Sequence, residues 1–128
     1  MSDLMFLAVI TRWKDEAIIE EFVRYYLDEG ADHIFIFDDG LDSGLPADIT
    51  SKSEITALRT RGFRNSQSQL DDVNKLVNDL RQQVEWIVFV DCDEFIAPRL
   101  NQNENLRNII KNNFHLLLNH LVNATKEK

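Results

Sequence analysis

The segment from Trp86 to Phe95 constrains the fold of this chain more than any other, because a run of apolar residues passes directly into a cluster of acids. The run Trp86–Val90 includes one Ile and two Val residues, which is typical of a strand buried on both faces of a parallel sheet. Open α/β sheets bind ligands at the carboxyl ends of their strands. We therefore expect Asp91 and Asp93 to lie at such an edge with a divalent cation, because burying acids without a partner is costly.

The rest of the chain alternates between apolar runs of strand length and segments with apolar residues at helical spacing. We expect strands at residues 5–11, 33–38, 55–59 and 86–91, with the first and the last central in the sheet. We expect a first helix capped by Asp15 and closed by Gly30, a second helix over Gln67–Gln83, and a long amphipathic helix over residues 101–128. The residues of the second helix expected to face inward are Leu70, Val73, Leu76, Val77 and Leu80. Residues 40–53 are expected to form a loop. This alternation predicts an α/β fold with a mostly parallel sheet between layers of helices.

The composition indicates a single domain spanning residues 1–128. A net charge of −8 disfavours nonspecific binding to nucleic acid or anionic lipid. Cys92 is the only cysteine, so an intramolecular disulfide is excluded and a reducing compartment is favoured. The run Met5–Ile10 is too short for a signal sequence or a membrane span, and no basic region precedes it. We therefore expect a cytoplasmic protein with no transmembrane segment and no nucleic-acid partner.

Three strand ends and one loop are expected to meet at one edge of the sheet. The polar residues concerned are Thr11 and Arg12 after the first strand, Asp38 and Asp39 after the second, Arg59, Arg61 and Arg64 after the third, and Asp91 and Asp93 after the fourth. Carboxylates that hold a divalent metal, beside guanidinium groups that bind phosphate bidentately, are suited to a diphosphate. The alternative interpretation is that Arg59, Arg61 and Arg64 lie in a solvated surface loop and bind no phosphate.

Four short motifs, in order and with plausible spacing, carry a resemblance to a known family. They are Trp13-Lys14-Asp15-Glu16, Gly30-Ala31-Asp32-His33-Ile34, Phe37-Asp38-Asp39-Gly40, and Trp86 to Phe95 followed by Pro98. The chain resembles the family 2-like glycosyltransferases, in the branch with the patterns W-K-N-E, G-[AV]-D-H, D-N-G-S-T-D and W-[ILV]-x-F-[ILV]-D-x-D-E-F. Gln69 and Asn74 also match this branch, and the resemblance covers about Phe6 to Phe114.

The resemblance implies a three-layer α/β/α GT-A fold and the transfer of a sugar from a nucleotide-diphosphate sugar donor to the hydroxyl of a glycan or another acceptor. It also implies a divalent cation, Mn²⁺ or Mg²⁺, that stabilises the charge on the departing diphosphate. Together with the basic loop, the expected nucleotide-sugar-binding set is Thr11, Arg12, Glu16, Asp38, Asp39, Arg61, Gln69 and Asp91. The expected metal ligands are Asp91 and Asp93, of which Asp93 is the better candidate for direct ligation.

The chain departs from the pattern of this branch at several points. Asp15 replaces the usual Asn, Leu41-Asp42-Ser43 replaces the S-T-D loop, and Val73 and Lys75 stand where Tyr and His are preferred. In inverting members a carboxylate base lies well beyond the D-x-D motif, whereas only one expected helix follows it here. We therefore expect a truncated fold that holds the donor-binding part, with no identifiable catalytic base.

Two alternatives from other classes remain at this point. The first is a non-catalytic nucleotide-binding or interaction module of the same lineage, since the acceptor part is missing. The second is a response-regulator receiver with Asp91 as phospho-acceptor, although a receiver carries its acidic pair after the first strand rather than the second. Manganese-dependent binding of a nucleoside diphosphate would separate the lineage from the receiver.

Overall fold

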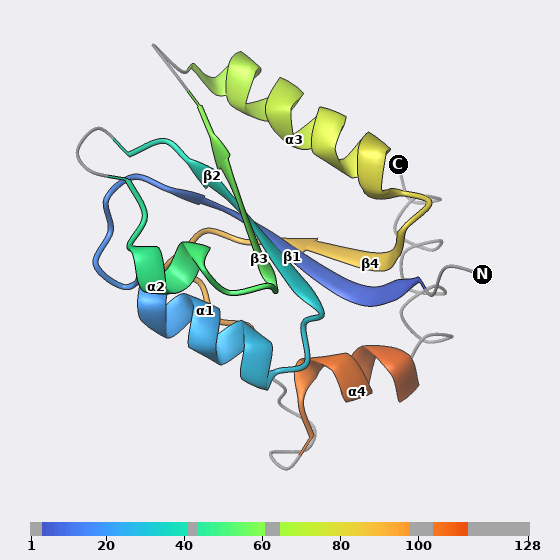
Figure 1. The fold of residues 1–128 in the computed structure, drawn as a ribbon. Coiled ribbons are helices and arrows are strands. Elements are labelled where there is room, and N and C mark those ends of the chain that lie inside the picture. The colour runs from blue at the N-terminus through green and yellow to red at the C-terminus, as the bar shows by residue number, and fades with distance from the viewer. Residues whose placement is uncertain (1–3, 41–43, 61–64, 98–103, 113–128) are drawn as a thin grey trace.

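Four strands form one sheet in which every neighbouring pair is parallel. They are β1 (Met5–Trp13), β2 (His33–Asp38), β3 (Ile55–Arg59) and β4 (Val84–Phe89), in the order β3-β2-β1-β4 (Figure 1). The structure is a computed structural model that describes residues 4–40, 44–60, 65–97 and 104–112. The expected α/β fold with a parallel sheet is confirmed, and the chain is Rossmann-like. The strand order also differs from the 2-1-3 arrangement of flavodoxin-like receivers.

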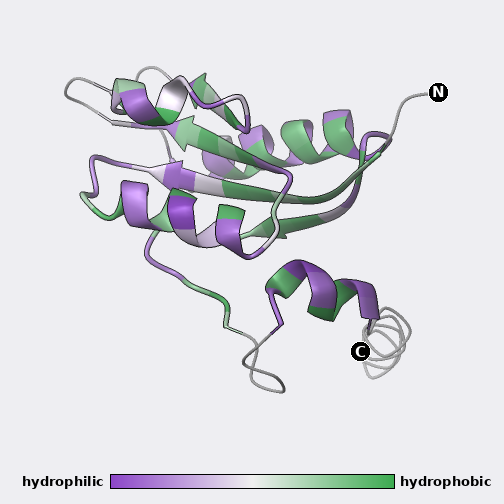
Figure 2. Ribbon diagram, turned by 60° about the horizontal axis from the view of Figure 1, so that its bottom comes forward, coloured by the Kyte–Doolittle hydropathy of each residue, from purple (hydrophilic) through white to green (hydrophobic). Residues whose placement is uncertain are grey.

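Helices lie on both faces of the sheet. The described helices are α1 (Ile19–Asp28), α2 (Ala47–Thr50), α3 (Ser66–Leu80) and α4 (Leu106–Asn112). Helix α3 covers one face, and the other three lie on the opposite face (Figure 1). The strands between them are mainly hydrophobic, whereas the helices alternate hydrophobic and hydrophilic residues (Figure 2). Each helix therefore contributes an apolar stripe to one of two cores, as amphipathic helices in layered folds do.

The two central strands are buried on both faces. Leu7 to Ile10 of β1 are fully buried; Val9 belongs to the core on the α1 side, while Ala8 and Ile10 belong to the core under α3. Ile34 and Ile36 of β2 are likewise fully buried. Apolar runs without polar interruption therefore form the centre of the sheet, as expected for parallel strands between two helical layers.

Strand β4 differs from the sequence-based expectation. Within the described residues it pairs only with β1 and lies at the edge of the sheet, so the prediction that it is central is wrong there. Glu85 and Phe89 are exposed, and Trp86 to Val88 are half-buried. The prediction that this strand is buried on both faces is wrong as well, because an edge strand has neighbours on one side only.

The first helix begins later than predicted. Asp15 does not cap it: α1 starts after Ile18, which makes no side-chain capping bond, and Asp15 itself has a positive φ of 67°. The C-terminus agrees with the prediction, because Gly30 follows the last turn at φ 94°. Its amide bonds to Leu27 O and the next amide bonds to Tyr26 O, which is the pair of contacts that closes a Schellman motif.

The other helices agree in part. Asn65 caps α3 through a reciprocal pair of bonds with Ser68, so this helix begins one residue earlier than predicted and ends at Leu80. Leu80 is buried, but Leu70 is exposed, which makes its prediction as a core residue wrong. The loop expected at residues 40–53 contains the short α2. The C-terminal helix is confirmed for Leu106–Asn112, and residues 113–128 lie outside the described residues.

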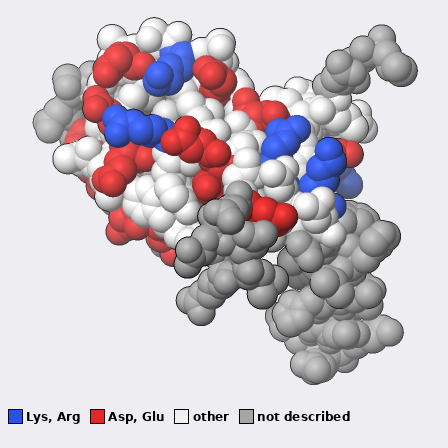
Figure 3. Space-filling model, turned by 90° about the horizontal axis from the view of Figure 1, so that it is seen from below, with Lys and Arg blue, Asp and Glu red and all other residues white. Residues whose placement is uncertain are grey.

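Acidic side chains predominate over basic ones on the face that carries α1, α2 and α4 (Figure 3). In the part of the chain that the structure describes, no helix has the length and apolar character needed to cross a membrane.

Candidate functional site

The carboxyl ends of all four strands lie at one edge of the sheet, because every pair is parallel. The register places Trp13 beside Asp38 and Asp38 beside Arg59, while the Val90 amide bonds to Ile10 O just before the D-x-D segment begins. The strand order reverses between β1 and β4, which is where open α/β sheets bind ligands. The expected meeting of strand ends is therefore confirmed.

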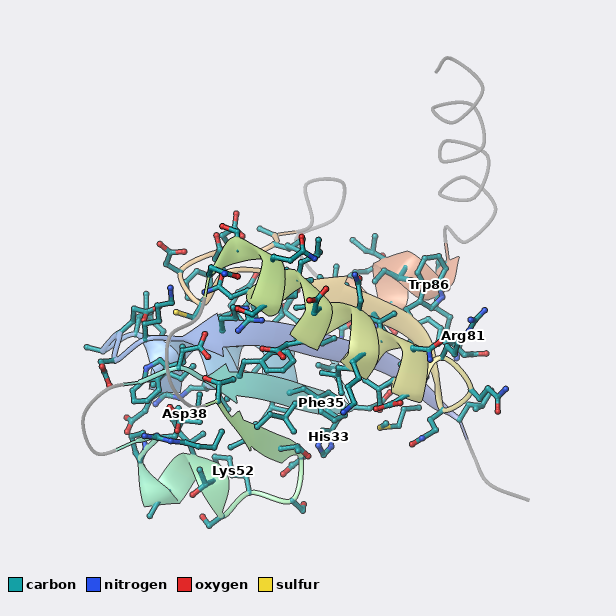
Figure 4. All side chains as sticks on the ribbon, turned by 90° about the horizontal axis from the view of Figure 1, so that it is seen from above. His33, Phe35, Asp38, Lys52, Arg81 and Trp86 are labelled. Atoms are coloured by element: carbon teal, nitrogen blue, oxygen red, sulfur yellow. The ribbon has the colours of Figure 1, made fainter. Side chains whose placement is uncertain are left out.

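Asp38 is buried at the end of β2, and its carboxylate organises the turn that follows. One oxygen accepts the Gly40 amide at 3.0 Å; the other accepts Arg59 Nη1 at 3.0 Å and the Leu45 amide at 3.4 Å. Figure 4 places Asp38 at the end of the sheet opposite to Arg81 and Trp86. Gly40 is required here, because a Cβ atom would lie 2.7 Å from both Trp13 Cζ3 and Asp15 Oδ1. The role of Asp38 in nucleotide binding stays a prediction.

Asp39 and Arg12 form a buried ion pair that joins β2 to β1 and α3. Arg12 Nη1 lies 2.9 Å from Asp39 Oδ2, and the side chains are 12% and 3% exposed. Arg12 also donates to the carbonyl of Gln69 at 2.5 Å, and its guanidinium lies 4.6 Å from the ring centre of Phe37. The hydroxyl of Thr60 donates to the other oxygen of Asp39. Three predicted site residues are thus brought together, but they bond to one another.

Thr11 points into the core and not toward the edge. It is fully buried, and its hydroxyl makes no hydrogen bond with the described residues. Arg61 and Arg64 lie outside the described residues, so their expected contact with phosphate stays a prediction. Arg59 is the described member of this basic loop, and its side chain is 46% exposed beyond its contact with Asp38.

Glu16 and Cys92 connect the loop after β1 to the segment after β4. The Cys92 thiol donates to Glu16 Oε2 at 2.6 Å, and Trp13 Nε1 donates to the carbonyl of Glu16 at 2.8 Å. Burial, followed by the neighbouring Glu16 and Asp93 carboxylates, raises the pKa of Cys92 to about 12. The thiol therefore stays protonated and acts as a hydrogen-bond donor to Glu16.

Residues Asp91 to Glu94 form a tight turn directly after β4. The Glu94 amide bonds to Asp91 O at 2.9 Å, and the Asp91 amide bonds to Glu94 Oε1 at 2.8 Å. Asp91 and Asp93 are both exposed, and within the described residues neither carboxylate forms a hydrogen bond or an ion pair. These two acids differ in this respect from Asp38 and Asp39, whose carboxylates are already bonded.

The donor set fits a hard divalent cation in part. Two exposed carboxylates are what Mg²⁺ or Mn²⁺ takes from a protein when phosphate oxygens and waters complete the shell. No group of three or more His, Cys, Asp or Glu side chains in the described ranges is arranged to hold a metal. Asp91 and Asp93 therefore suit a cation that is shared with a phosphate ligand, and not a cation that the protein encloses.

A groove of about 300 Å³ lies beside this edge, between α3 and the carboxyl ends of β2 and β3. Arg59 and Lys75 line it together with Asp72 and Asp79, so both signs of charge are present. A second groove of about 750 Å³ lies at the opposite end of the sheet, beside the amino ends of β1 and β4, and is lined in part by Trp86. Only the first is close to the strand ends that carry the predicted site.

Two residues that the sequence-based prediction left out hold the segment after the D-x-D turn. Tyr26 donates its hydroxyl to Glu94 O at 2.8 Å and accepts the Ile96 amide at 3.0 Å, while Tyr25 donates to Ile96 O at 2.6 Å. Both tyrosines pack against Phe95. Nothing in the sequence signals these hydroxyl contacts, which depend on how α1 packs against the segment after β4.

No protein-family model matches the sequence, and no match was found among the curated proteins or the solved structures.

Proposed function

We propose that this chain binds a nucleotide-diphosphate sugar together with Mn²⁺ or Mg²⁺ at the carboxyl edge of its sheet, as the donor-binding part of a GT-A glycosyltransferase. The observation that carries the proposal is the D-x-D turn. Asp91 and Asp93 follow the end of β4, where the strand order reverses; both are exposed, and their carboxylates form no bond with the described residues. The order of motifs along the chain supports the same lineage.

In this proposal each part of the edge has a separate task. Asp91 and Asp93 hold the cation, which when bound neutralises phosphate oxygens and the charge that develops on the departing diphosphate. Arg59 is 46% exposed beyond its contact with Asp38 and can bind a phosphate or ribose oxygen at the mouth of the groove. Arg12 and Asp39 bond to each other and join the carboxyl ends of β1 and β2.

The acceptor in the proposed reaction is a hydroxyl group of a glycan or another molecule, and we assign no described residue as its base. Glu94 is engaged in the turn, and Asp38 and Asp39 are buried and bonded. The same observations favour one second candidate, a module of this lineage that binds the nucleotide without turnover. Release of free sugar from the donor, or its transfer to an acceptor, separates the two.

The proposal is tested by calorimetric titration of UDP and GDP into the protein with Mn²⁺ and with EDTA. We expect binding with Mn²⁺, and we expect D91A and D93A each to weaken it by at least tenfold. D28A is the matched control, because Asp28 is an exposed acid at the end of α1. Equal binding by D91A, D93A and D28A would overturn the assignment of the metal ligands.

A further inference from the structure

Glu94 is the third acid of the D-C-D-E sequence, but its side chain points to a different target from those of Asp91 and Asp93. Its Oε1 accepts the backbone amide of Asp91 at 2.8 Å, while its own amide bonds to Asp91 O at 2.9 Å. The two bonds run in opposite directions between the first and last residues of the turn. They fix the backbone of Asp91 on both sides of its Cα atom.

Two further contacts hold the turn, one from α1 and one from the loop before it. Tyr26 donates to the carbonyl of Glu94 at 2.8 Å, and the Cys92 thiol donates to Glu16 at 2.6 Å. Burial raises the pKa of Tyr26, so its hydroxyl remains a donor at neutral pH. Cys92 is buried while Asp91 and Asp93 on either side are exposed. The turn is thus anchored at its second and fourth residues, Cys92 and Glu94, while the side chains of its first and third residues are exposed.

We infer that Glu94 is a positioning residue that orients the Asp91 and Asp93 carboxylates for a cation, and is not itself a metal ligand. This inference rests on the proposed function. The two possible roles of Glu94, positioning and metal ligation, depend on different properties of its side chain. Positioning needs only an acceptor oxygen at Oε1, whereas ligation of a divalent cation needs the negative charge.

Two substitutions divide these properties. E94Q keeps an oxygen acceptor of the same length and removes the charge, while E94A removes both. Residues that orient metal ligands typically cost 10- to 100-fold in metal affinity when they are changed. We therefore expect E94A to weaken Mn²⁺ binding by about tenfold or more, and E94Q to remain within about threefold of the wild type.

The experiment measures Mn²⁺ affinity by electron paramagnetic resonance of the free ion, in the presence of saturating UDP, for the wild type, E94Q and E94A. Amide hydrogen exchange at Asp91 gives a second readout, and we expect faster exchange in E94A but not in E94Q. Circular dichroism checks that both variants fold, as the exposed position of Glu94 predicts.

If E94Q loses as much affinity as E94A, Glu94 acts through its charge and the inference is wrong. If E94A binds Mn²⁺ as tightly as the wild type does, the inference is also wrong, but the proposed function stands. If the wild type binds no Mn²⁺, the proposed function fails first.

Discussion

Replacing Arg12 with Met should destabilise the protein more than replacing its partner Asp39 with Asn. The Asp39 side chain is 3% exposed, and its carboxylate contacts only Arg12 and the hydroxyl of Thr60 among the described residues. Met has an apolar side chain of similar width but lacks the guanidinium, which in Arg12 lies over the Phe37 ring. The substitution would therefore leave a buried carboxylate with no cation beside it.

The expected magnitudes follow from what each substitution leaves behind. Breaking a buried ion pair by removing one partner costs about 3–5 kcal/mol, which is a large fraction of the roughly 5–15 kcal/mol that stabilises a typical domain. In D39N the guanidinium keeps the carbonyl of Gln69 at 2.5 Å and the carboxylate of Asp72 at 3.6 Å. Loss of one charged hydrogen bond then costs about 1.5–3 kcal/mol, less than in R12M.

Urea unfolding followed by circular dichroism measures both free energies, and the R12M/D39N double variant completes a cycle. R24M is the matched control, because Arg24 is exposed on α1 and its substitution should change the free energy of unfolding by less than about 0.5 kcal/mol. A cost for R12M that equals that of R24M, or falls below that of D39N, would refute the argument. Asp39 would then be hydrated in solution.

Three further predictions concern other parts of the structure. G30A should lower the free energy of unfolding by about 2–4 kcal/mol, because Gly30 has φ 94° and a Cβ atom would lie 2.5 Å from Arg107 Cβ. A thermal midpoint equal to that of the wild type would contradict this prediction. Cys92, with a pKa of about 12 and almost no exposed surface, should react with a disulfide reagent at pH 8 only when urea unfolds the chain, and rapid native labelling would contradict its burial. F37A should lower the free energy of unfolding by about 3–5 kcal/mol and F89A by roughly half as much, because Phe37 is buried and Phe89 is 45% exposed on the edge strand. Equal losses in urea unfolding would mean that the outer side of β4 is covered in solution.

The sequence predicted the strands well because burial on both faces requires uninterrupted apolar runs. The runs at His33 and Ile55 correspond to β2 and β3 at both ends. The apolar run before Asp91 misled in one respect: its composition matches a central strand, but in the described residues it forms an edge. The position of a strand in a sheet depends on pairing with distant segments, which local composition does not contain.

The candidate site was predictable at the level of the edge but not of the side chain. Asp38 and Asp91 both follow an apolar run and look equivalent in sequence. In the structure Asp38 meets Arg59 and two backbone amides, while Asp91 remains exposed. The partners of Asp38 lie 2, 7 and 21 residues further along the chain, so only the folded arrangement reveals which acids are available to a ligand.

This division of the acids has an electrostatic consequence for the proposed function. Among the described residues at the carboxyl ends of the strands, Arg12 is paired with Asp39 and Arg59 with Asp38, whereas the exposed acids Asp91 and Asp93 have no basic partner there. A nucleoside diphosphate approaching this pair without a cation meets like charge, in a chain whose net charge is already −8. Nucleotide and cation must therefore bind together, and the coupling is reciprocal: whatever factor Mn²⁺ adds to the affinity for UDP, UDP must add to the affinity for Mn²⁺. Tight binding of UDP in EDTA would show that the basic groups of this edge, and not the D-x-D turn, hold the diphosphate.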